Sequence, residues 1–336
     1  MWMFKAKPFV CIWGLLFCVL FGDRMALAAQ SAPVVPIAEV LDKDAALKIL
    51  ERCADAAKTA TYSGTYVYQH GDEMSTYRMI HVLDGHDDVE RREALDGSPR
   101  EYYRQGQRVS IYPADPQQKT LDRRYTAKLF PRQLPDQPAK LLQAYGLIRL
   151  GSERVAGRDT TVYQLEPLDQ YRYPHRFWID DASGLLLKWA MMGMRKEASQ
   201  LFAFTDIQVG GSVDRKQLKP VRELQSVEIE TNSHTMSLPQ ETQWEIKSPP
   251  AGFRLLKQSS KALPGKQRKV LHHLYSDGVV TVSVFIEPIH QRLPLGLAHQ
   301  GATHLFTRQS GTSLVMALGE VPAATVEAFA NGYNAR

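Results

Sequence analysis

The chain has 336 residues and a formal net charge of +5, from 41 Lys and Arg against 36 Asp and Glu. This length can bury a sizeable apolar core, most simply as two domains. The mild positive bias does not support a nucleic-acid-binding class, which needs a strong basic excess.

The first 28 residues have the pattern of a secretory signal peptide. Lys5 and Lys7 precede an almost unbroken apolar run over residues 9–21, which is too short to span a membrane. Ala26-Leu27-Ala28 fits a small-x-small cleavage site, so the mature chain is predicted to begin near Ala29. A retained N-terminal anchor is the alternative.

Removal of this segment would also change the cysteine content and the charge. Cys11 and Cys18 would leave, so Cys53 alone would remain and the mature chain could form no internal disulfide. Three cations and one anion leave as well, so 38 Lys and Arg would face 35 Asp and Glu, a formal charge of +3. Stability must then come from the core.

A helix is predicted for "DKDAALKILERCADAAKTA", residues 42–60, with Asp42 or Asp44 as its cap. Ala46, Leu50, Cys53 and Ala57 recur at helical spacing and form a narrow face. Because this face is rich in Ala, we expect the helix to lie close against a sheet. Cys53 on that face is predicted to be a small buried hydrophobe and not a reactive thiolate.

From Tyr62 onward, apolar and polar residues alternate with a period of two, which is typical of strands. Hairpin turns are predicted at 70–73, 156–159 and 181–184, within a series of short strands. Strands that close around a helix can leave an apolar cavity. An ordinary core with Tyr hydroxyls at its rim is the alternative. Candidate wall residues are Tyr66, Tyr68, Tyr77, Tyr102, Tyr103, Tyr112, Tyr163 and Trp178.

Basic and aromatic side chains are mixed in "DQYRYPHRFWIDDASGLLLKW", residues 169–189. Such a mixture is compatible with a nucleic-acid surface, a lipid-binding wall or a packed hairpin. Strand alternation places Arg176 and Trp178 on one face and Phe177 and Ile179 on the other. We expect the second face to pack under the helices, so the basic and aromatic residues do not form one surface.

The sequence loses its period-two apolar pattern after Val209. Residues 210–241 are polar or weakly apolar, and we interpret them as a linker. A second, smaller unit over 242–334 contains "PPAGFRLLKQ", "KVLHHLYSD" and the strongly apolar "GVVTVSVFIEP", followed by a possible short helix.

Motifs of catalysis or cofactor binding are missing from the sequence: G-x-S-x-G, H-E-x-x-H, G-x-G-x-x-G and the P-loop. Asp180 and Asp181 are explained by the turn D-D-A-S-G. His272 and His273 are neighbours on a predicted strand, so they should point to opposite faces. The best metal candidate is "HVLDGHDD", which we interpret instead as a solvated turn. Its candidate ligands are His81, Asp84, His86, Asp87 and Asp88.

Four segments together resemble the RseB/MucB family, whose members regulate the envelope-stress sigma factor sigma-E in Gram-negative bacteria. The segments are "YSGTYVYQHGDEMSTYRMIH" (62–81), "GLIRLGSERVAGRDTTVYQLEPLDQYRYPHRFWIDDASGLLLKW" (146–189), "PPAGFRLLKQ" (249–258) and "VTVSVFIEPIH" (280–290). Each segment alone has low specificity, but the order and spacing of the four fit the family over nearly all of the mature chain. The N-terminal stretch "SAPVVPIAEVLDKD" and the segment "LKWAMMGMRKEASQ" depart from the pattern.

The resemblance implies an α+β fold. Residues 37–209 would form a large half-open antiparallel β-barrel with packed helices, similar to LolA and LolB, that senses lipid. Residues 242–334 would form a small C-terminal α/β domain that binds the partner. The family role implied is that of a periplasmic protein without enzyme activity, cofactor or metal.

The resemblance also implies the partners. The protein would bind the periplasmic domain of a membrane anti-sigma factor of the RseA or MucA type. It would protect that domain from site-1 proteolysis until lipopolysaccharide or lipoprotein acyl chains release it, and it would form a homodimer. A LolA-type lipid or lipoprotein carrier is the alternative. The candidates for the lipid cavity are Tyr66, Tyr68, Tyr163, Phe177 and Trp178, and those for the partner surface are Phe253, Phe285 and Glu287.

Overall fold

The computed structural model describes residues 38–85, 87–106, 108–112, 130–193, 197–219, 227–230, 244–262, 269–289 and 294–335. The predicted signal peptide with its cleavage site lies outside these residues, as does most of the predicted linker. In the described part of the chain, no helix combines the length and apolarity needed to cross a membrane.

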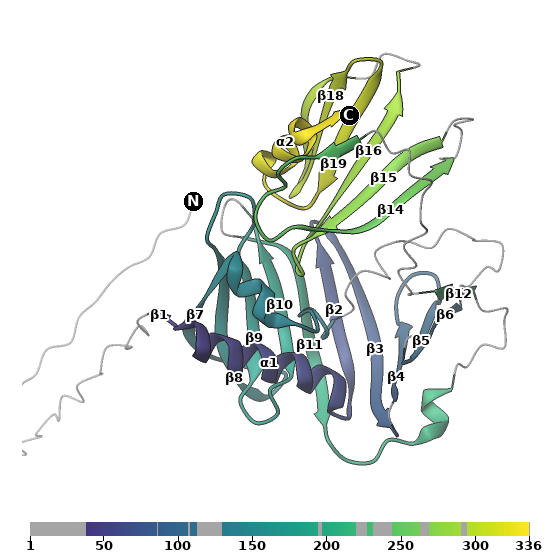
Figure 1. Ribbon diagram of the computed structural model, residues 1–336. Coiled ribbons are helices and arrows are strands. Elements are labelled where there is room, and N and C mark those ends of the chain that lie inside the picture. Colours follow the sequence, from purple (N-terminus) through teal and green to yellow (C-terminus); the bar gives the residue numbers. More distant parts are fainter. Residues whose placement is uncertain are drawn as a thin grey trace, which may run out of the picture. The chain divides into compact units, whose positions relative to one another are not determined.

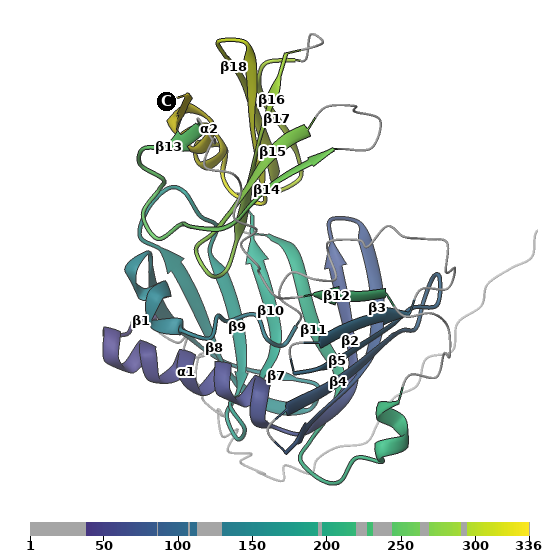
Figure 2. The same ribbon diagram turned by 45° about the vertical axis from the view of Figure 1, so that its right-hand side comes forward.

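A twelve-stranded antiparallel sheet forms the first domain, in the order β1-β7-β8-β9-β10-β11-β2-β3-β4-β5-β6-β12 (Figure 1). The sheet curves around the helix α1 (Lys43–Thr59), and β1 and β12 stand at its opposite ends without pairing to each other, so it is a half-open barrel and this part of the predicted fold class is confirmed (Figure 1 and Figure 2). The strands are β1 (Glu39–Val40), β2 (Tyr62–His70), β3 (Glu73–Asp84), β4 (Asp87–Ala94), β5 (Glu101–Gln105), β6 (Arg108–Tyr112), β7 (Tyr145–Val155), β8 (Arg158–Pro167), β9 (His175–Asp180), β10 (Leu186–Met192), β11 (Ala198–Val209) and β12 (Val227–Glu230).

The helix α1 (Lys43–Thr59) lies across strands of this sheet (Figure 2). The Asp42 carboxylate caps it by accepting a hydrogen bond from the Ala45 N–H at 2.8 Å. Its buried face contains Ala46, Leu50 and Cys53, as predicted, and it joins the main apolar core. A short 3₁₀ helix, η2 (Pro138–Gln143), packs beside α1.

Cys53 is only 1% exposed, and its burial raises the pKa of the thiol from 9.0 to about 12. A buried, protonated thiol does not attack disulfide reagents. We therefore expect 5,5′-dithiobis(2-nitrobenzoate) to leave the native mature protein unmodified over an hour at pH 8. The same protein in urea should release one equivalent of thionitrobenzoate within minutes. Rapid release from the native protein would contradict the assigned burial.

Most of the mixed basic and aromatic segment, residues 169–189, forms the hairpin β9–β10, which decides the face on which each side chain lies. Phe177 and Ile179 are buried in the core cluster that contains the α1 residues, which confirms the predicted packing face. Trp178 lies on the other face, where the Lys188 ammonium sits 4.1 Å from the centre of its ring. The aromatic side chains of the segment are therefore divided between the two faces, Trp178 with Lys188 on one and Phe177 on the other.

A six-stranded antiparallel sheet, in the order β14-β15-β16-β19-β18-β17, forms the second domain. Its helix α2 (Ala323–Gly332) packs on β16, β18 and β19 and buries Val282, Val284 and Phe329. The smaller C-terminal domain of the predicted fold class is thus confirmed. Its strands are β14 (Arg254–Ala262), β15 (Lys269–Ser276), β16 (Thr281–Pro288), β17 (Gly296–Gln300), β18 (Thr303–Ser310) and β19 (Ser313–Gly319), and a separate pair joins β13 (Trp244–Ile246) to β20 (Tyr333–Ala335).

Part of the predicted linker is structured. The 3₁₀ helix η3 (Arg215–Leu218) follows β11, and β12 pairs with β6 in the register Ile229↔Val109. β12 lies inside the segment 210–241, so the chain returns to the first sheet before it enters the second domain.

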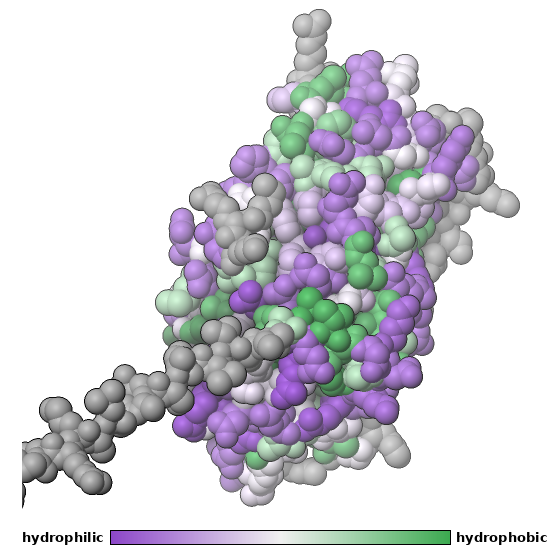
Figure 3. All heavy atoms as spheres, turned by 90° about the vertical axis from the view of Figure 1, so that its left-hand side faces the viewer, coloured by the Kyte–Doolittle hydropathy of each residue, from purple (hydrophilic) through white to green (hydrophobic). Residues whose placement is uncertain are grey.

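The side of the molecule shown in Figure 3 is mostly hydrophilic, with apolar residues in limited areas. Large apolar side chains that are exposed on the first domain include Val40 at 75% and Leu168 at 65%. Scattered exposed residues of this kind are normal on a folded protein and need no binding role.

Candidate functional site

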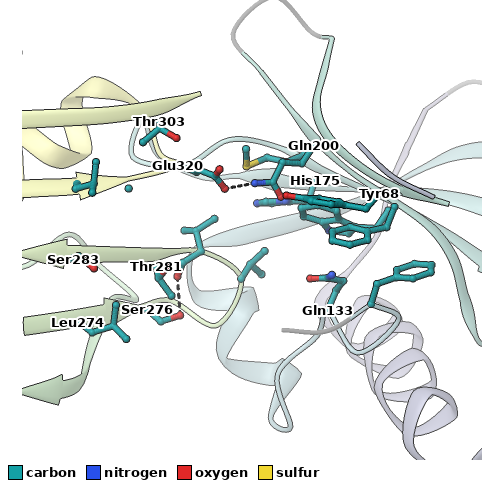
Figure 4. A pocket seen from close by; sticks show the side chains of 18 of the residues that line it. Tyr68, Gln133, His175, Gln200, Leu274, Ser276, Thr281, Ser283, Thr303 and Glu320 are labelled. Atoms are coloured by element: carbon teal, nitrogen blue, oxygen red, sulfur yellow. Dashed lines mark hydrogen bonds between the residues drawn. The ribbon is translucent and has the colours of Figure 1, made fainter. Parts of the chain in front are cut away.

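A pocket of about 910 Å³ lies between the inner face of the first sheet and the second sheet (Figure 4). Its volume falls at the upper end of the range for ligand sites. The first domain contributes an aromatic wall, and the second domain contributes a mixed apolar and hydroxyl wall. The principal residues are Tyr66, Tyr68, Phe130, Trp189 and Phe202 from the first domain, and Leu256, Ser259, Leu274, Ser283 and Leu318 from the second.

The aromatic wall is built by alternation on β2, β10 and β11. Tyr68 stacks on Phe202 with ring centroids 4.4 Å apart, in register with it across β2 and β11. Phe130 comes from outside the strands and places its ring 5.5 Å from that of Phe202. Aromatic pairs of this kind form a rigid apolar surface that loses little side-chain entropy on binding.

The opposite wall is the face of the second sheet that α2 leaves uncovered. Val284 points to the core under α2, so its neighbours Ser283 and Phe285 on β16 point the other way. β14 is an end strand of this sheet, and its Leu256 and Ser259 line the pocket. An end strand presents backbone N–H and C=O groups to which an extended peptide can pair.

One polar connection between the domains stands beside the pocket. Glu320 accepts a hydrogen bond from Gln200 and lies 2.9 Å from His70 Nε2 (Figure 4 shows the Gln200 contact). The side chains of His70 and Glu320 are 32% and 34% exposed, so water screens the pair. Such a pair contributes at most about 1 kcal/mol.

A second connection is buried. The Asp277 carboxylate accepts hydrogen bonds from the Tyr145 hydroxyl and from Arg172 Nε, both at 2.8 Å. Burial alone would raise the pKa of Asp277, but these bonds and two backbone N–H groups hold that pKa below its ordinary value. Arg172 also donates to the Ala251 carbonyl and lies 4.6 Å from the ring of Phe253. This junction fixes the two walls of the pocket relative to each other.

A buried ionic group lies under the aromatic wall, on the inner face of β4 and β5. Glu90 accepts hydrogen bonds from Arg92 Nε and, at 3.0 Å, from Arg104 Nη2. Burial alone would raise the pKa of Glu90, but the two guanidinium groups lower it to about 2. Arg92 Nη1 also donates to the Tyr66 hydroxyl at 3.1 Å, which ties the ionic group to the pocket wall.

Two of the five predicted lipid-cavity residues, Tyr66 and Tyr68, line the pocket. The structure does not bring the other three there. Phe177 is fully buried in the core, and Trp178 lies on the outer face, where its Nε1 donates to Glu153 at 2.7 Å. Tyr163 pairs with Phe177 across β8 and β9, away from the pocket residues.

The three predicted partner-binding residues are also separated. Phe253 is 4% exposed and packs edge-on against Phe329 at the buried junction. It is therefore part of the packing of the second domain and does not line the pocket. Phe285 is half-buried on the uncovered face and stacks on His272 at 4.5 Å. Glu287 is 2% exposed on the same strand.

The metal candidate is not assembled among the described residues, in which no group of three His, Cys, Asp or Glu could hold an ion. His81 Nδ1 lies 2.7 Å from the Ala60 carbonyl, and its ring stacks on Tyr62. The side chains of Asp84, His86 and Asp87 lie outside the described part. His272 and His273 point to opposite faces, as predicted: His273 contacts the Tyr333 hydroxyl on the α2 side.

Asp180 and Asp181 have turn and ion-pair roles. Asp180 binds Arg158 with two hydrogen bonds of 2.8 Å and accepts from the Ser183 N–H. Asp181 accepts from the Thr161 hydroxyl at 2.7 Å. Both carboxylates are therefore satisfied by the hairpin, and the turn interpretation holds.

Sequence reasoning missed the whole second-domain wall of the pocket and three residues of the aromatic wall, Phe130, Trp189 and Phe202. The alternation of β10 and β11 could have indicated Trp189 and Phe202, because Trp189 pairs with both Phe177 and Phe202. Nothing in the sequence around Phe130 indicates that it enters the core, since it precedes a Pro-interrupted stretch without a period.

Models of one protein family match both domains. The model described as the MucB/RseB N-terminal domain matches residues 45–222, and the one described as the MucB/RseB C-terminal domain matches residues 239–334.

Curated relatives carry regulatory names. The sigma factor AlgU regulatory protein MucB of Pseudomonas aeruginosa is 29% identical over 318 residues, which cover 93% of this chain and 94% of that protein. The sigma-E factor regulatory protein RseB of Haemophilus influenzae is 24% identical over 286 residues, covering 83% and 87%. These relatives are named as regulatory proteins and not as enzymes.

Solved structures with a similar fold include complexes. The complex of MucA and MucB from Pseudomonas aeruginosa matches with 28% identity and a TM-score of 0.73, over 87% of this chain and 99% of that chain. A crystal structure of MucB with MucA(peri) matches with 27% identity and a TM-score of 0.71, over 86% and 98%.

Proposed function

Because the chain belongs to the MucB/RseB family, we propose that it is a periplasmic regulator that binds the periplasmic domain of a membrane anti-sigma factor in the pocket between its two domains. The observation that carries this proposal is the make-up of the pocket. An aromatic wall faces an end strand, so the site offers both apolar anchors and backbone hydrogen-bonding groups to an extended peptide.

Bound in this way, the anti-sigma segment would be shielded from the site-1 protease. A protease needs an extended, accessible stretch of substrate, and a segment paired with β14 and packed on Tyr68 and Phe202 is not accessible. The regulator would thus keep sigma-E inactive without chemistry of its own.

A lipid signal would act by linkage. Acyl chains of lipopolysaccharide or of a lipoprotein can pack on the same aromatic wall, and a lipid that binds the free protein better than the complex shifts the equilibrium toward release. The same proposal includes export to the periplasm with cleavage of the signal peptide, and assembly of the mature protein as a homodimer. Sedimentation of the mature protein tests the dimer.

Leu255 and Leu256 on β14 provide a matched pair for the test. They are 46% and 50% exposed, but only Leu256 lines the pocket. We expect Leu256→Ala to weaken binding of the purified anti-sigma periplasmic domain about tenfold in calorimetry, because it removes an apolar anchor. Leu255→Ala should leave the dissociation constant within about twofold.

Protease assays complete the test. The wild-type protein should slow site-1 cleavage of the anti-sigma domain, and added lipopolysaccharide should restore cleavage. Equal affinities for both leucine variants would reject the pocket as the binding site. Failure of the wild-type protein to bind the domain, together with binding of outer-membrane lipoproteins, would favour a LolA-type carrier instead.

A further inference from the structure

A small recess of about 40 Å³ adjoins the wide pocket on the inner face of β4 and β5. Four residues line both cavities, so the recess is a side branch of the pocket: Tyr66, Tyr77, Arg92 and Arg100. Ala94, Tyr102 and Ile111 add apolar and phenolic wall to it.

Positive charge is in excess around this recess. The register of β4 and β5 places Arg92 and Arg104 on the inner side, and Arg132 joins them by its ion pair with Asp88. Arg100, just before β5, lines both cavities. In the ion pairs described on the inner side, the guanidinium groups of Arg92, Arg104 and Arg132 share two carboxylates, those of Asp88 and Glu90.

Glu101 also lines the recess, but its carboxylate pairs with an arginine on the outer face. Its partner across the strands is Glu93, on the outer face, and its carboxylate lies 3.3 Å from Arg91 Nη2 on that side. The ion pairs described on the inner face therefore leave an excess of one positive charge among largely buried side chains, where an anion is favoured.

Arg92 has hydrogen-bonding capacity to spare. The residue is 4% exposed, its Nε and Nη1 donate to Glu90 and to the Tyr66 hydroxyl, and its Nη2 has no hydrogen-bond partner among the described residues. A buried charged donor without an acceptor is unfavourable, because the group has lost its hydration and gained no bond in return. An acceptor brought by a ligand would remove that cost.

The size of the recess favours a carboxylate. One water needs about 10–15 Å³ of cavity measured in this way, so 40 Å³ holds about three water-sized positions. A carboxylate has three heavy atoms, whereas a phosphate group has five. The neighbouring end strand β14 favours a peptide as the carrier of that group over a lipid head.

We propose that the recess binds an acidic side chain, Asp or Glu, of the peptide that occupies the wide pocket, with Arg92 and Arg100 as its partners. This inference rests on the proposed function, since the peptide is the anti-sigma segment. A guanidinium can bind a carboxylate through two hydrogen bonds of fixed geometry. The recess would therefore set the register of the bound segment, that is, which of its residues lies beside the aromatic wall.

The test is a double-mutant cycle between the recess and the peptide. Each Asp and Glu of the purified anti-sigma periplasmic domain is changed singly to its amide, and binding is measured to the wild-type protein and to the Arg100→Gln variant. Arg91→Gln is the matched control, because it removes the same charge from the outer face of β4. Arg92→Lys, which keeps the charge facing Glu90, is the second recess variant.

One acidic position of the domain should lose about tenfold in affinity as its amide, and R100Q should lose about as much. The two changes together should cost no more than either alone, while R91Q stays within about twofold of wild type. Additive losses at every acidic position, or no loss with R100Q and R92K, would overturn the acidic-peptide subsite while leaving the proposed function intact. Dependence on Arg100 of binding to phosphatidylglycerol vesicles, but not to the domain, would assign the recess to a lipid head and overturn it as well. No binding of the domain to the wild-type protein would reject the proposed function itself.

Discussion

Replacement of Asp277 by Ala is expected to lower the free energy of unfolding by about 3–5 kcal/mol. The change leaves the Arg172 side chain, which is 0% exposed, without its carboxylate and removes the acceptor of the Tyr145 hydroxyl. The N–H groups of Val279 and Val280 lose their acceptor too. Urea denaturation followed by tryptophan fluorescence measures the effect.

Asp159→Ala is the control for this variant. Asp159 also pairs with an arginine, Arg154 at 3.4 Å, but the two side chains are 81% and 72% exposed. Water screens such a pair, so its loss should cost less than about 1 kcal/mol. Equal effects of D277A and D159A would show that the buried junction does not hold the domains together.

The junction matters for function because it sets the distance between the pocket walls. The hairpin tip after β15 enters the first domain at Gly278, whose φ is +105°. A Cβ there would lie 3.2 Å from a Leu141 side-chain atom and 3.3 Å from one of Pro135. D277A should therefore also weaken binding of the anti-sigma domain, although Asp277 is not among the residues that line the pocket.

Replacement of Glu90 by Gln has the second large expected effect, a loss of about 3–5 kcal/mol in the free energy of unfolding at pH 7. Arg92 and Arg104 would face a neutral amide in place of the carboxylate that binds both of them. The same urea experiment at pH 7 measures this loss.

The pH dependence of the free energy of unfolding tests the role of Glu90 independently. The folded-state pKa of Glu90 is about 2, below the ordinary value of 4.5. A depressed pKa contributes stability that is complete above the ordinary value and is lost as the pH falls toward the folded value. The wild-type free energy of unfolding should drop between about pH 4.5 and pH 2, and E90Q should show a shallower drop.

Glu93→Gln is the control for Glu90. Glu93 lies on the outer face of the same strand, 34% exposed, and pairs with Arg78 at 3.6 Å. E93Q should cost less than about 1 kcal/mol at pH 7. The assigned pairing of Glu90 with Arg92 and Arg104 would be contradicted if E90Q were as stable as E93Q and its free energy of unfolding fell in acid as steeply as that of the wild type.

Local patterns predicted the elements that depend on near neighbours in the chain. The spacing of Ala46, Leu50 and Cys53 predicted the buried face of α1. Period-two alternation predicted that Phe177 packs in the core and that His273 and its neighbour His272 point to opposite faces. These features follow from helix and strand geometry alone, so a single sequence is enough. The polar stretch after Val209 indicated the second domain, and the resemblance supplied the half-open barrel.

The pocket could not be predicted in the same way, because it is made of long-range contacts. Arg172 and Asp277 are 105 positions apart, and neither lies in a motif that indicates a partner. Phe130 enters the core from an aperiodic stretch. Trp189 lines the pocket and the predicted Trp178 does not, since composition names aromatic residues but not the face that meets the second domain.

Hydrogen–deuterium exchange of the mature protein, with and without the anti-sigma periplasmic domain, tests most directly whether the pocket between the domains is the binding site. We expect the domain to slow exchange of backbone amides along β14 and in β2 and β11, which line the pocket. Exchange on β8, on the far side of β9 from the pocket wall, should not change. Protection confined to β8 and β9, with β14 unchanged, would contradict the account.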